Sequence, residues 1–227
     1  MFTYLYLLID FFVILIPLFF TFHKRLNFFR NYPPFFISTF VVGAVFVVWD
    51  VYFTNLGYWG FNPNYLTGVN LFSLPIEEVL FFFCIPYACV FSYHVLETIY
   101  PISDSDNLKK FNYLFSFVLF VLGLIFIEKH YTSITFIALS IVLLIAPLFI
   151  NLKMFYRAYG ILLIPFLITN GLLTGSFIED QVVWYNDNYN LGIRILTIPV
   201  EDVFYGMLLI LLNVIIYEKL RDSVFKR

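Results

Sequence analysis

Two pairs of adjacent acids are the residues in this 227-residue chain best suited to do chemistry. Glu77–Glu78 and Glu201–Asp202 each lie two residues after a proline and open an apolar run. Burial and a neighbouring like charge both disfavour the ionised form of a carboxyl. Such a group can keep its proton near neutral pH and act as a Brønsted acid. The two pairs therefore predict acid–base chemistry on an apolar molecule.

The same acids also have a purely structural explanation. Proline suits the first position of a helix, and acids in the first turn gain about 0.3–1 kcal/mol from the helix dipole. This explains one acid per helix better than two. Adjacent helix positions point about 100° apart, so one acid of a pair can face the bundle while the other supports it. We favour a functional role for both pairs.

Two further polar pairs share a four-residue spacing near the outer ends of expected helices. Asp50 and Thr54 form one pair, and Asn170 and Thr174 form the other. These side chains can orient the acids through hydrogen bonds, or they can make ordinary polar contacts between helices. Both interpretations remain open.

Aromatic and basic residues of the expected outer loops complete the candidate site. Trp59 and Tyr185 occupy positions typical of an interfacial belt, and aromatic faces can stabilise a carbocation. Arg194, the only basic residue of the second outer loop, is a candidate ion-pair partner of Glu201 or Asp202. We predict that these three residues bind or orient the substrate.

The sequence argues against several other kinds of site. Its three histidines and two cysteines lack metal-ligand spacing, and no glycine-rich dinucleotide fingerprint is present. We therefore expect no metal and no cofactor. A net charge of −2 without a long basic run argues against a nucleic acid partner.

The composition requires lipid around the elements that position these residues. The chain is 62% apolar and 12% charged, with a mean hydropathy of +0.89. Soluble domains are about 45–50% apolar and about 25% charged. We expect an all-α integral membrane protein, one membrane domain over 1–227, with about seven transmembrane helices. The expected spans are 2–21, 35–54, 75–96, 111–127, 132–150, 159–177 and 196–217.

Basic residues predict the orientation of these spans. All of the 13 lysines and arginines except Lys129 and Arg194 fall on the side that carries the C-terminus. Because cytoplasmic loops are enriched in Lys and Arg, we expect the N-terminus outside and the C-terminus in the cytoplasm. The expected location is the cell (inner, cytoplasmic) membrane.

The two acidic motifs also predict an internal repeat. Residues 75–79 (PIEEV) are matched by 199–203 (PVEDV), 124 positions later. An offset of four helices preserves orientation, so the halves would be parallel repeats. We expect three-helix repeats over 1–107 and 131–227, joined by a connector helix over 108–130.

With these residues in place, the chain resembles the small membrane lycopene cyclases of the heterodimeric or fused type, which use no flavin. The resemblance covers nearly the whole chain, and the two halves, separate subunits in some members, look fused here. It rests on Pro75–Glu78 with Phe81–Phe83, Ile198–Asp202 with Tyr205, Asn170–Thr174 and Leu191–Arg194.

The resemblance implies cyclisation of the ψ end groups of lycopene to β-ionone rings without net redox change. An acid protonates the terminal double bond, the neighbouring alkene attacks the tertiary cation, and a base removes a ring proton. γ-Carotene forms first and β-carotene second. The donor is expected among Glu77, Glu78 and Glu201, with Asp202 as the orienting or accepting partner. Expected partners are lycopene or a related acyclic carotenoid, membrane lipid and other enzymes of the carotenoid pathway.

Two other functional classes fit part of the pattern. Intramembrane acids in parallel repeats also suit a proton- or ion-coupled transporter. The lack of broken, glycine-rich helices and the position of the acids near one face argue against it. A non-catalytic carotenoid-binding subunit is the third interpretation.

Overall fold

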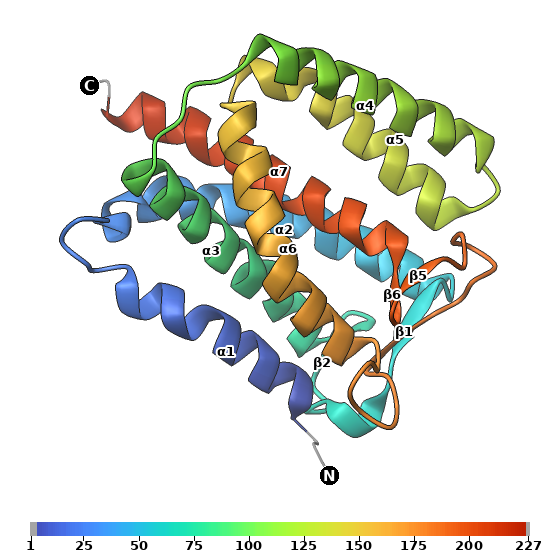
Figure 1. Cartoon of the computed structure of the whole chain (residues 1–227). Helices are drawn as coiled ribbons and strands as arrows, with labels where there is room; N and C mark the ends of the chain where they lie inside the picture. The colour runs from blue at the N-terminus through green and yellow to red at the C-terminus, as the bar shows by residue number, and fades with distance from the viewer. Residues whose placement is uncertain (1–3, 226–227) are drawn as a thin grey trace.

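The apolar runs of the sequence form α-helices throughout the structure. The computed structural model describes residues 4–225 of the chain. Seven α-helices lie in this range (Figure 1). They are α1 (Leu5–Phe20), α2 (Tyr32–Asn55), α3 (Ile76–Ile99), α4 (Asp106–Ile125), α5 (His130–Ile145), α6 (Leu152–Leu173) and α7 (Val200–Phe225). Short 3-10 turns are η1 (Phe28–Asn31), η2 (Pro63–Tyr65) and η3 (Ala146–Leu148).

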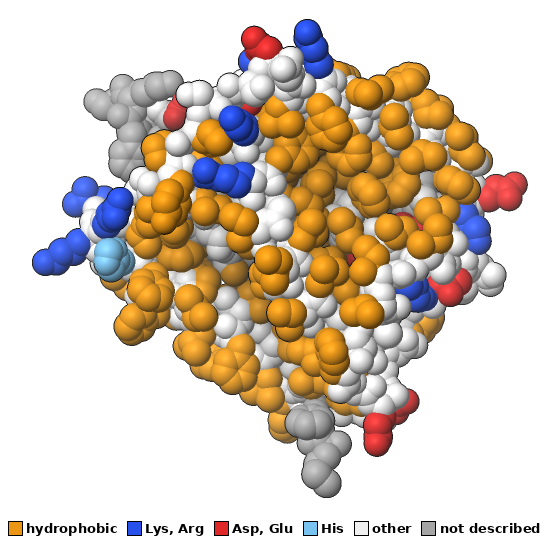
Figure 2. Space-filling view, in the orientation of Figure 1, with side chains coloured by type: hydrophobic (Ala, Val, Ile, Leu, Met, Phe, Trp, Pro, Cys, Tyr) orange, Lys and Arg blue, Asp and Glu red, His pale blue; other side chains and the backbone are white. Residues whose placement is uncertain are grey.

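Six of these helical segments are long and apolar enough to cross a membrane. The remaining helix, α1, is apolar but only 16 residues long, or about 24 Å at 1.5 Å per residue. Hydrophobic side chains cover much of the visible surface (Figure 2). The expected all-helical, multi-pass membrane protein is therefore confirmed, with six full-length candidate spans and one shorter apolar helix.

The sixth helix differs at both ends from its expected bounds of 159–177. It begins at Leu152 because the Asn151 side chain accepts a hydrogen bond from the Met154 backbone N–H at 3.0 Å. It ends at Leu173, and Gly175 then adopts a φ of +95° that the helix cannot continue. The expected end at 177 was therefore wrong.

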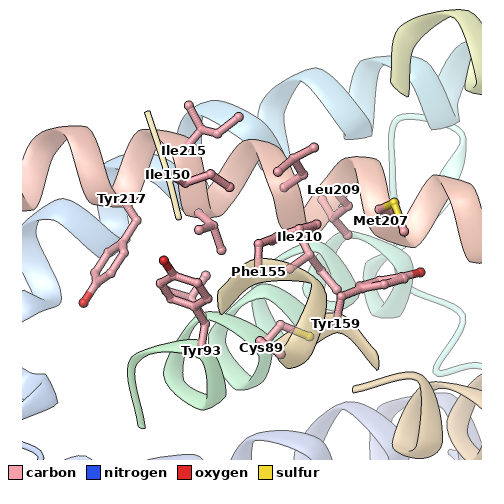
Figure 3. Close-up of a cluster of buried hydrophobic side chains, with 14 of the residues drawn as sticks. Cys89, Tyr93, Ile150, Phe155, Tyr159, Met207, Leu209, Ile210, Ile215 and Tyr217 are labelled. Atoms are coloured by element: carbon pink, nitrogen blue, oxygen red, sulfur yellow. The ribbon is translucent and has the colours of Figure 1, made fainter. Parts of the chain in front are cut away.

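The helices pack around α3 and α7, which carry the acidic pairs. α3 contacts α1, α2 and α6, while α7 contacts α2 and α5. α4 and α5 lie side by side at one edge of the molecule, and α1 lies at the opposite edge (Figure 1). The main core lies between these layers, and Figure 3 shows the part where Cys89 of α3, Tyr159 of α6 and Ile210 of α7 are packed together.

Short strands, which the sequence did not predict, precede α3 and α7. β1 (Trp59–Phe61) pairs antiparallel with β4 (Val183–Tyr185), and thus joins two loops that are far apart in the chain. Two small hairpins lead directly into the helices. They are β2–β3 (Asn70–Leu71 and Leu74–Pro75) and β5–β6 (Arg194–Ile195 and Ile198–Pro199).

The two hairpins have the same local geometry. Each turn contains a residue in the left-handed region, Phe72 with φ 59° and Leu196 with φ 58°. The first helical N–H then bonds back to the loop, from Ile76 to the Val69 carbonyl and from Val200 to the Ile193 carbonyl. Corresponding residues differ by 124 positions, the offset of the acidic motifs. The full repeat over 1–107 and 131–227 remains a prediction.

Candidate active site

The hairpins deliver both acidic pairs to the first turns of α3 and α7. All four carboxyls are buried. Glu77 and Glu201 are 0% exposed, Glu78 is 9% exposed and Asp202 is 5% exposed. Burying a charge is costly unless it is paired or hydrogen-bonded, so the partners of each acid indicate what it does.

The first acid of each pair holds its own hairpin loop. Glu77 Oε1 accepts the Thr67 backbone N–H at 2.6 Å, and Glu201 Oε1 accepts the Leu191 backbone N–H at 2.8 Å. Glu201 Oε1 also accepts a hydrogen bond from the Thr132 hydroxyl at 2.5 Å. Neither Glu77 nor Glu201 lines the central cavity described below.

The second acid of each pair faces that cavity. The cavity lies between α1, α3, α6 and α7, beneath the paired strands β1 and β4. Its carboxyl groups are those of Glu78, Asp202 and Asp50. Its aromatic walls are Tyr6, Trp59, Phe61, Phe81, Tyr131, Tyr159, Phe166, Tyr185 and Tyr205. A mostly apolar cavity with a few convergent polar groups is typical of a small-molecule site.

Asp202 accepts three hydrogen bonds inside this cavity. The Tyr131 hydroxyl donates to Oδ1 at 2.6 Å. Oδ2 accepts from the Asn170 amide at 2.8 Å and from the Tyr185 hydroxyl at 2.9 Å. Hydrogen bonds to a carboxylate favour its charged form. The surroundings of Asp202 thus suit an anion.

Glu78 has a poorer set of donors. Within residues 4–225, its Oε2 accepts one hydrogen bond, from the Tyr6 hydroxyl of α1 at 2.6 Å. Asp10, one turn further along α1, is buried as well, and neither of its carboxyl oxygens has a partner among the described residues. With one donor and buried acids nearby, Glu78 is in an environment that favours the protonated carboxyl.

Tyr185 belongs to the cavity wall and lies outside the helices. Burial raises the pKa of its phenol well above the ordinary value, and the negative charge of Asp202 raises it further. Tyr185 therefore stays protonated and donates to Asp202.

The other predicted site residues fall into two groups, those that line the cavity and those that do not. Asp50, Trp59 and Asn170 line the cavity, as does Tyr185. Thr54 does not line it; its hydroxyl is buried without a hydrogen-bond partner in the described part of the chain.

Thr174 and Arg194 lie away from the acids. The Thr174 hydroxyl bonds to the Asn170 carbonyl at 2.8 Å and to the Thr197 hydroxyl at 2.7 Å. Arg194 pairs with Asp187 at 2.5 Å and donates to the Thr197 carbonyl. The expected pairing of Arg194 with Glu201 or Asp202 was therefore wrong, because a nearer loop acid takes the guanidinium.

Sequence reasoning missed the tyrosines that donate to the acids. Tyr6 and Tyr131 are two of 17 tyrosines, and neither stands beside a recognisable motif. They differ by 125 positions, close to the offset of the acidic motifs, so aligning the two halves residue by residue was the signal that could have found them.

The arrangement can perform acid–base chemistry on an apolar substrate. A carboxyl with one donor and a carboxylate with three donors line the same aromatic cavity. A general acid and a general base with separate environments are thereby available at one site.

Comparison with known proteins points to the same chemistry. The family model of lycopene cyclase matches residues 3–96 and 128–220, which is most of the chain. Searches of curated proteins and of solved structures returned no match. On the strength of the family match, the chain belongs to the lycopene cyclase family, enzymes of carotenoid biosynthesis that act on lycopene as intramolecular lyases.

Proposed function

We propose that this chain converts the ψ end groups of lycopene to β-ionone rings, with Glu78 as the proton donor and Asp202 as the base. The observation that carries the proposal is the shared cavity, in which acids from α3 and α7 meet with unequal hydrogen bonding. The family match supports lycopene as the substrate.

The reaction begins at Glu78. Its proton passes to the terminal double bond of lycopene and leaves a tertiary cation on the carbon that bears two methyl groups. Glu78 is then an anion, which the Tyr6 hydroxyl stabilises by its hydrogen bond. The aromatic faces of Trp59 and Tyr205 attract the cation.

Ring closure and proton loss follow. The next double bond of the substrate attacks the cation, forming the ring bond and moving the positive charge to a ring carbon. Asp202 removes the adjacent ring proton, whose electrons form the double bond of the β ring. No atom is gained or lost, so each end is isomerised without an oxidant. Transfer of the proton from Asp202 back to Glu78 completes the cycle.

Glu77 and Glu201 act as positioning residues in this scheme. Each accepts a backbone N–H of the loop that precedes its helix, and thus fixes the first turn that carries Glu78 or Asp202. Asn170 orients Asp202 directly. Asp50 is buried and lines the same cavity, and its proposed role is to orient Glu78 and Asp202.

The proposal extends to the whole membrane domain. In two parallel repeats, the acidic starts of α3 and α7 lie at the same membrane face. Two observations support such repeats: the two hairpins are offset by the same 124 positions as the acidic motifs, and the family model matches two separate stretches of the chain. The excess of Lys and Arg on the C-terminal side supports an outside N-terminus in a cytoplasmic membrane. Carotenoid-pathway enzymes in the same membrane are the proposed suppliers of lycopene.

A lycopene-accumulating bacterial host tests this function. Expression of the chain is expected to convert red lycopene to γ- and β-carotene, separated by chromatography and identified by absorbance and mass. An empty vector is the control. Lycopene that persists unchanged although the protein is present in the membrane contradicts the proposal.

A further inference from the structure

The paired strands β1 and β4 form a two-stranded strap across one end of the catalytic cavity. Side chains alternate across a strand. On the inner face, Trp59, Phe61, Val183 and Tyr185 line the cavity. Gly60, the central residue of β1, pairs with Trp184, the central residue of β4.

Gly60 allows Trp184 to lie directly on the strap. A Cβ atom built at Gly60 would lie 2.3 Å from the indole Cζ2 of Trp184 and 2.6 Å from its Cε2. These distances are far below van der Waals contact, so any side chain at position 60 must displace the indole or separate the strands. The ring thus covers the outer face of the strap because residue 60 has no side chain.

Backbone hydrogen bonds extend the strap at both ends. The Asn62 N–H donates to the Val182 carbonyl, and the Asn186 N–H donates to the Tyr58 carbonyl, both at 2.8 Å. The strap therefore covers 58–62 and 182–186. A continuous backbone ladder leaves few gaps for water.

A second, polar pocket lies on the other side of the strap. Glu179, Asp180 and Thr197 line it together with Trp184, and Phe61 lines both this pocket and the catalytic cavity. Glu179 and Asp180 are exposed, so this pocket is accessible to water. The shared residue Phe61 belongs to the strap, which therefore lies between this pocket and the cavity that Glu78 and Asp202 line.

We propose that the strap selects cyclisation over hydration by keeping water from the cation, and that Gly60 and Trp184 determine this specificity. The inference rests on the proposed function. When the strap is opened, a water oxygen attacks the tertiary cation left by protonation from Glu78. Asp202 accepts a proton from that water, leaving a tertiary alcohol. One water is added to the terminal double bond, and no oxidant or reductant is needed.

The experiment compares products of wild-type membranes with those of Gly60→Ala, Trp184→Ala and Gly160→Ala. Gly160 of α6 is the matched control because an added Cβ there meets no atom within 4 Å. Membranes are incubated with lycopene in ¹⁸O-labelled water, and the carotenoids are analysed by chromatography and mass spectrometry. In both strap variants, the ratio of labelled tertiary alcohol to cyclic product is expected to rise about tenfold or more. A tenfold change corresponds to about 1.4 kcal/mol in the difference between the activation free energies of hydration and cyclisation. The Gly160 variant is expected to keep the wild-type ratio.

The outcomes separate this inference from the proposed function. Rings without labelled alcohol in membrane-inserted Trp184→Ala overturn the role of the strap, while leaving the cyclase function in place. Trp184 is 37% exposed and its removal creates no clash. Trp184→Ala therefore tests the role of the strap even if Gly60→Ala does not accumulate. A wild-type chain that forms no ring contradicts the proposed function itself.

Discussion

At the scale of single residues, the contrast between Asp202 and Glu78 lies in their hydrogen-bond donors. Asp202 accepts from Tyr131, Asn170 and Tyr185, whereas Glu78 accepts only from Tyr6 among the residues that the structure describes. In an apolar cavity, each donor to a carboxylate lowers the free energy of the anion. Two similar side chains on equivalent helix turns can therefore hold opposite protonation states and serve as acid and base.

The role of Asp202 predicts the effect of an amide at that position. Asp202→Asn keeps the size of the side chain but removes the proton acceptor, so cyclisation is expected to fall about 10²- to 10⁴-fold. Tyr185→Phe removes one of these three donors and is expected to lower cyclisation about 10- to 10²-fold, because a single hydrogen bond to a charged group contributes about 1.5–3 kcal/mol and each 1.4 kcal/mol is about tenfold in rate. Both are measured as rings formed per unit of membrane-inserted protein. Wild-type activity of Asp202→Asn contradicts the assignment.

At the scale of elements, the hairpin before α7 contains a strained residue. Leu196 has a φ of 58°, a conformation that costs a non-glycine residue about 1–3 kcal/mol, although Asn adopts it more readily. Leu196→Asn is therefore expected to raise the free energy of unfolding by about 0.5–1 kcal/mol. Thermal unfolding in detergent measures this change, as a Tm higher by about 1–4 °C. Ile195→Asn, at a neighbour without positive φ, should bring no gain, and a gain there equal to that at Leu196 contradicts the strain argument.

The same elements show where sequence reasoning succeeds and where it stops. Long apolar runs predicted the helices because each helix buries or exposes to lipid a continuous stretch of the chain. The strands were missed, since two or three residues carry no measurable period and β1 pairs with β4 more than 120 positions away. The acidic pairs were predicted from their residue types and spacing. Which acid of a pair faces the cavity depends on the rotation of its helix about the helix axis. The partners Tyr6 and Tyr131 depend on tertiary packing, which no local pattern reports.

A polar cluster at the far end of α3 and α7 ties these two helices together. Arg221 donates to both carboxylate oxygens of Glu97, at 2.5 and 2.9 Å, and also pairs with Glu218. Arg221→Gln leaves both acids without their cation, and partial exposure moderates the cost, so the free energy of unfolding should fall by about 1–3 kcal/mol. Lys109→Gln breaks the exposed pair with Asp106 and should change the free energy of unfolding by less than about 1 kcal/mol. Equal Tm values for the two variants contradict this difference.

At the scale of the whole molecule, the proposed orientation makes a prediction about labelling. Asn188 and Lys110 are both exposed. The proposed topology has Asn188 in an outer loop and Lys110 at the opposite membrane face. In a chain with Cys84 and Cys89 replaced by alanine, a membrane-impermeant maleimide on intact cells should label Asn188→Cys and not Lys110→Cys. Permeabilised cells, in which both cysteines react, are the control. Labelling of Lys110→Cys alone in intact cells reverses the orientation.

The central claim is that Glu78, and not its neighbour Glu77, supplies the proton in the shared cavity. Conversion of lycopene by Glu78→Gln and Glu77→Gln, at matched levels of membrane-inserted protein, tests it most directly. Because Glu77 faces the Thr67 loop, Glu77→Gln is expected to keep most of the activity, whereas Glu78→Gln should lose about 10²-fold or more. Cyclic carotenes formed by Glu78→Gln at the wild-type rate contradict the account.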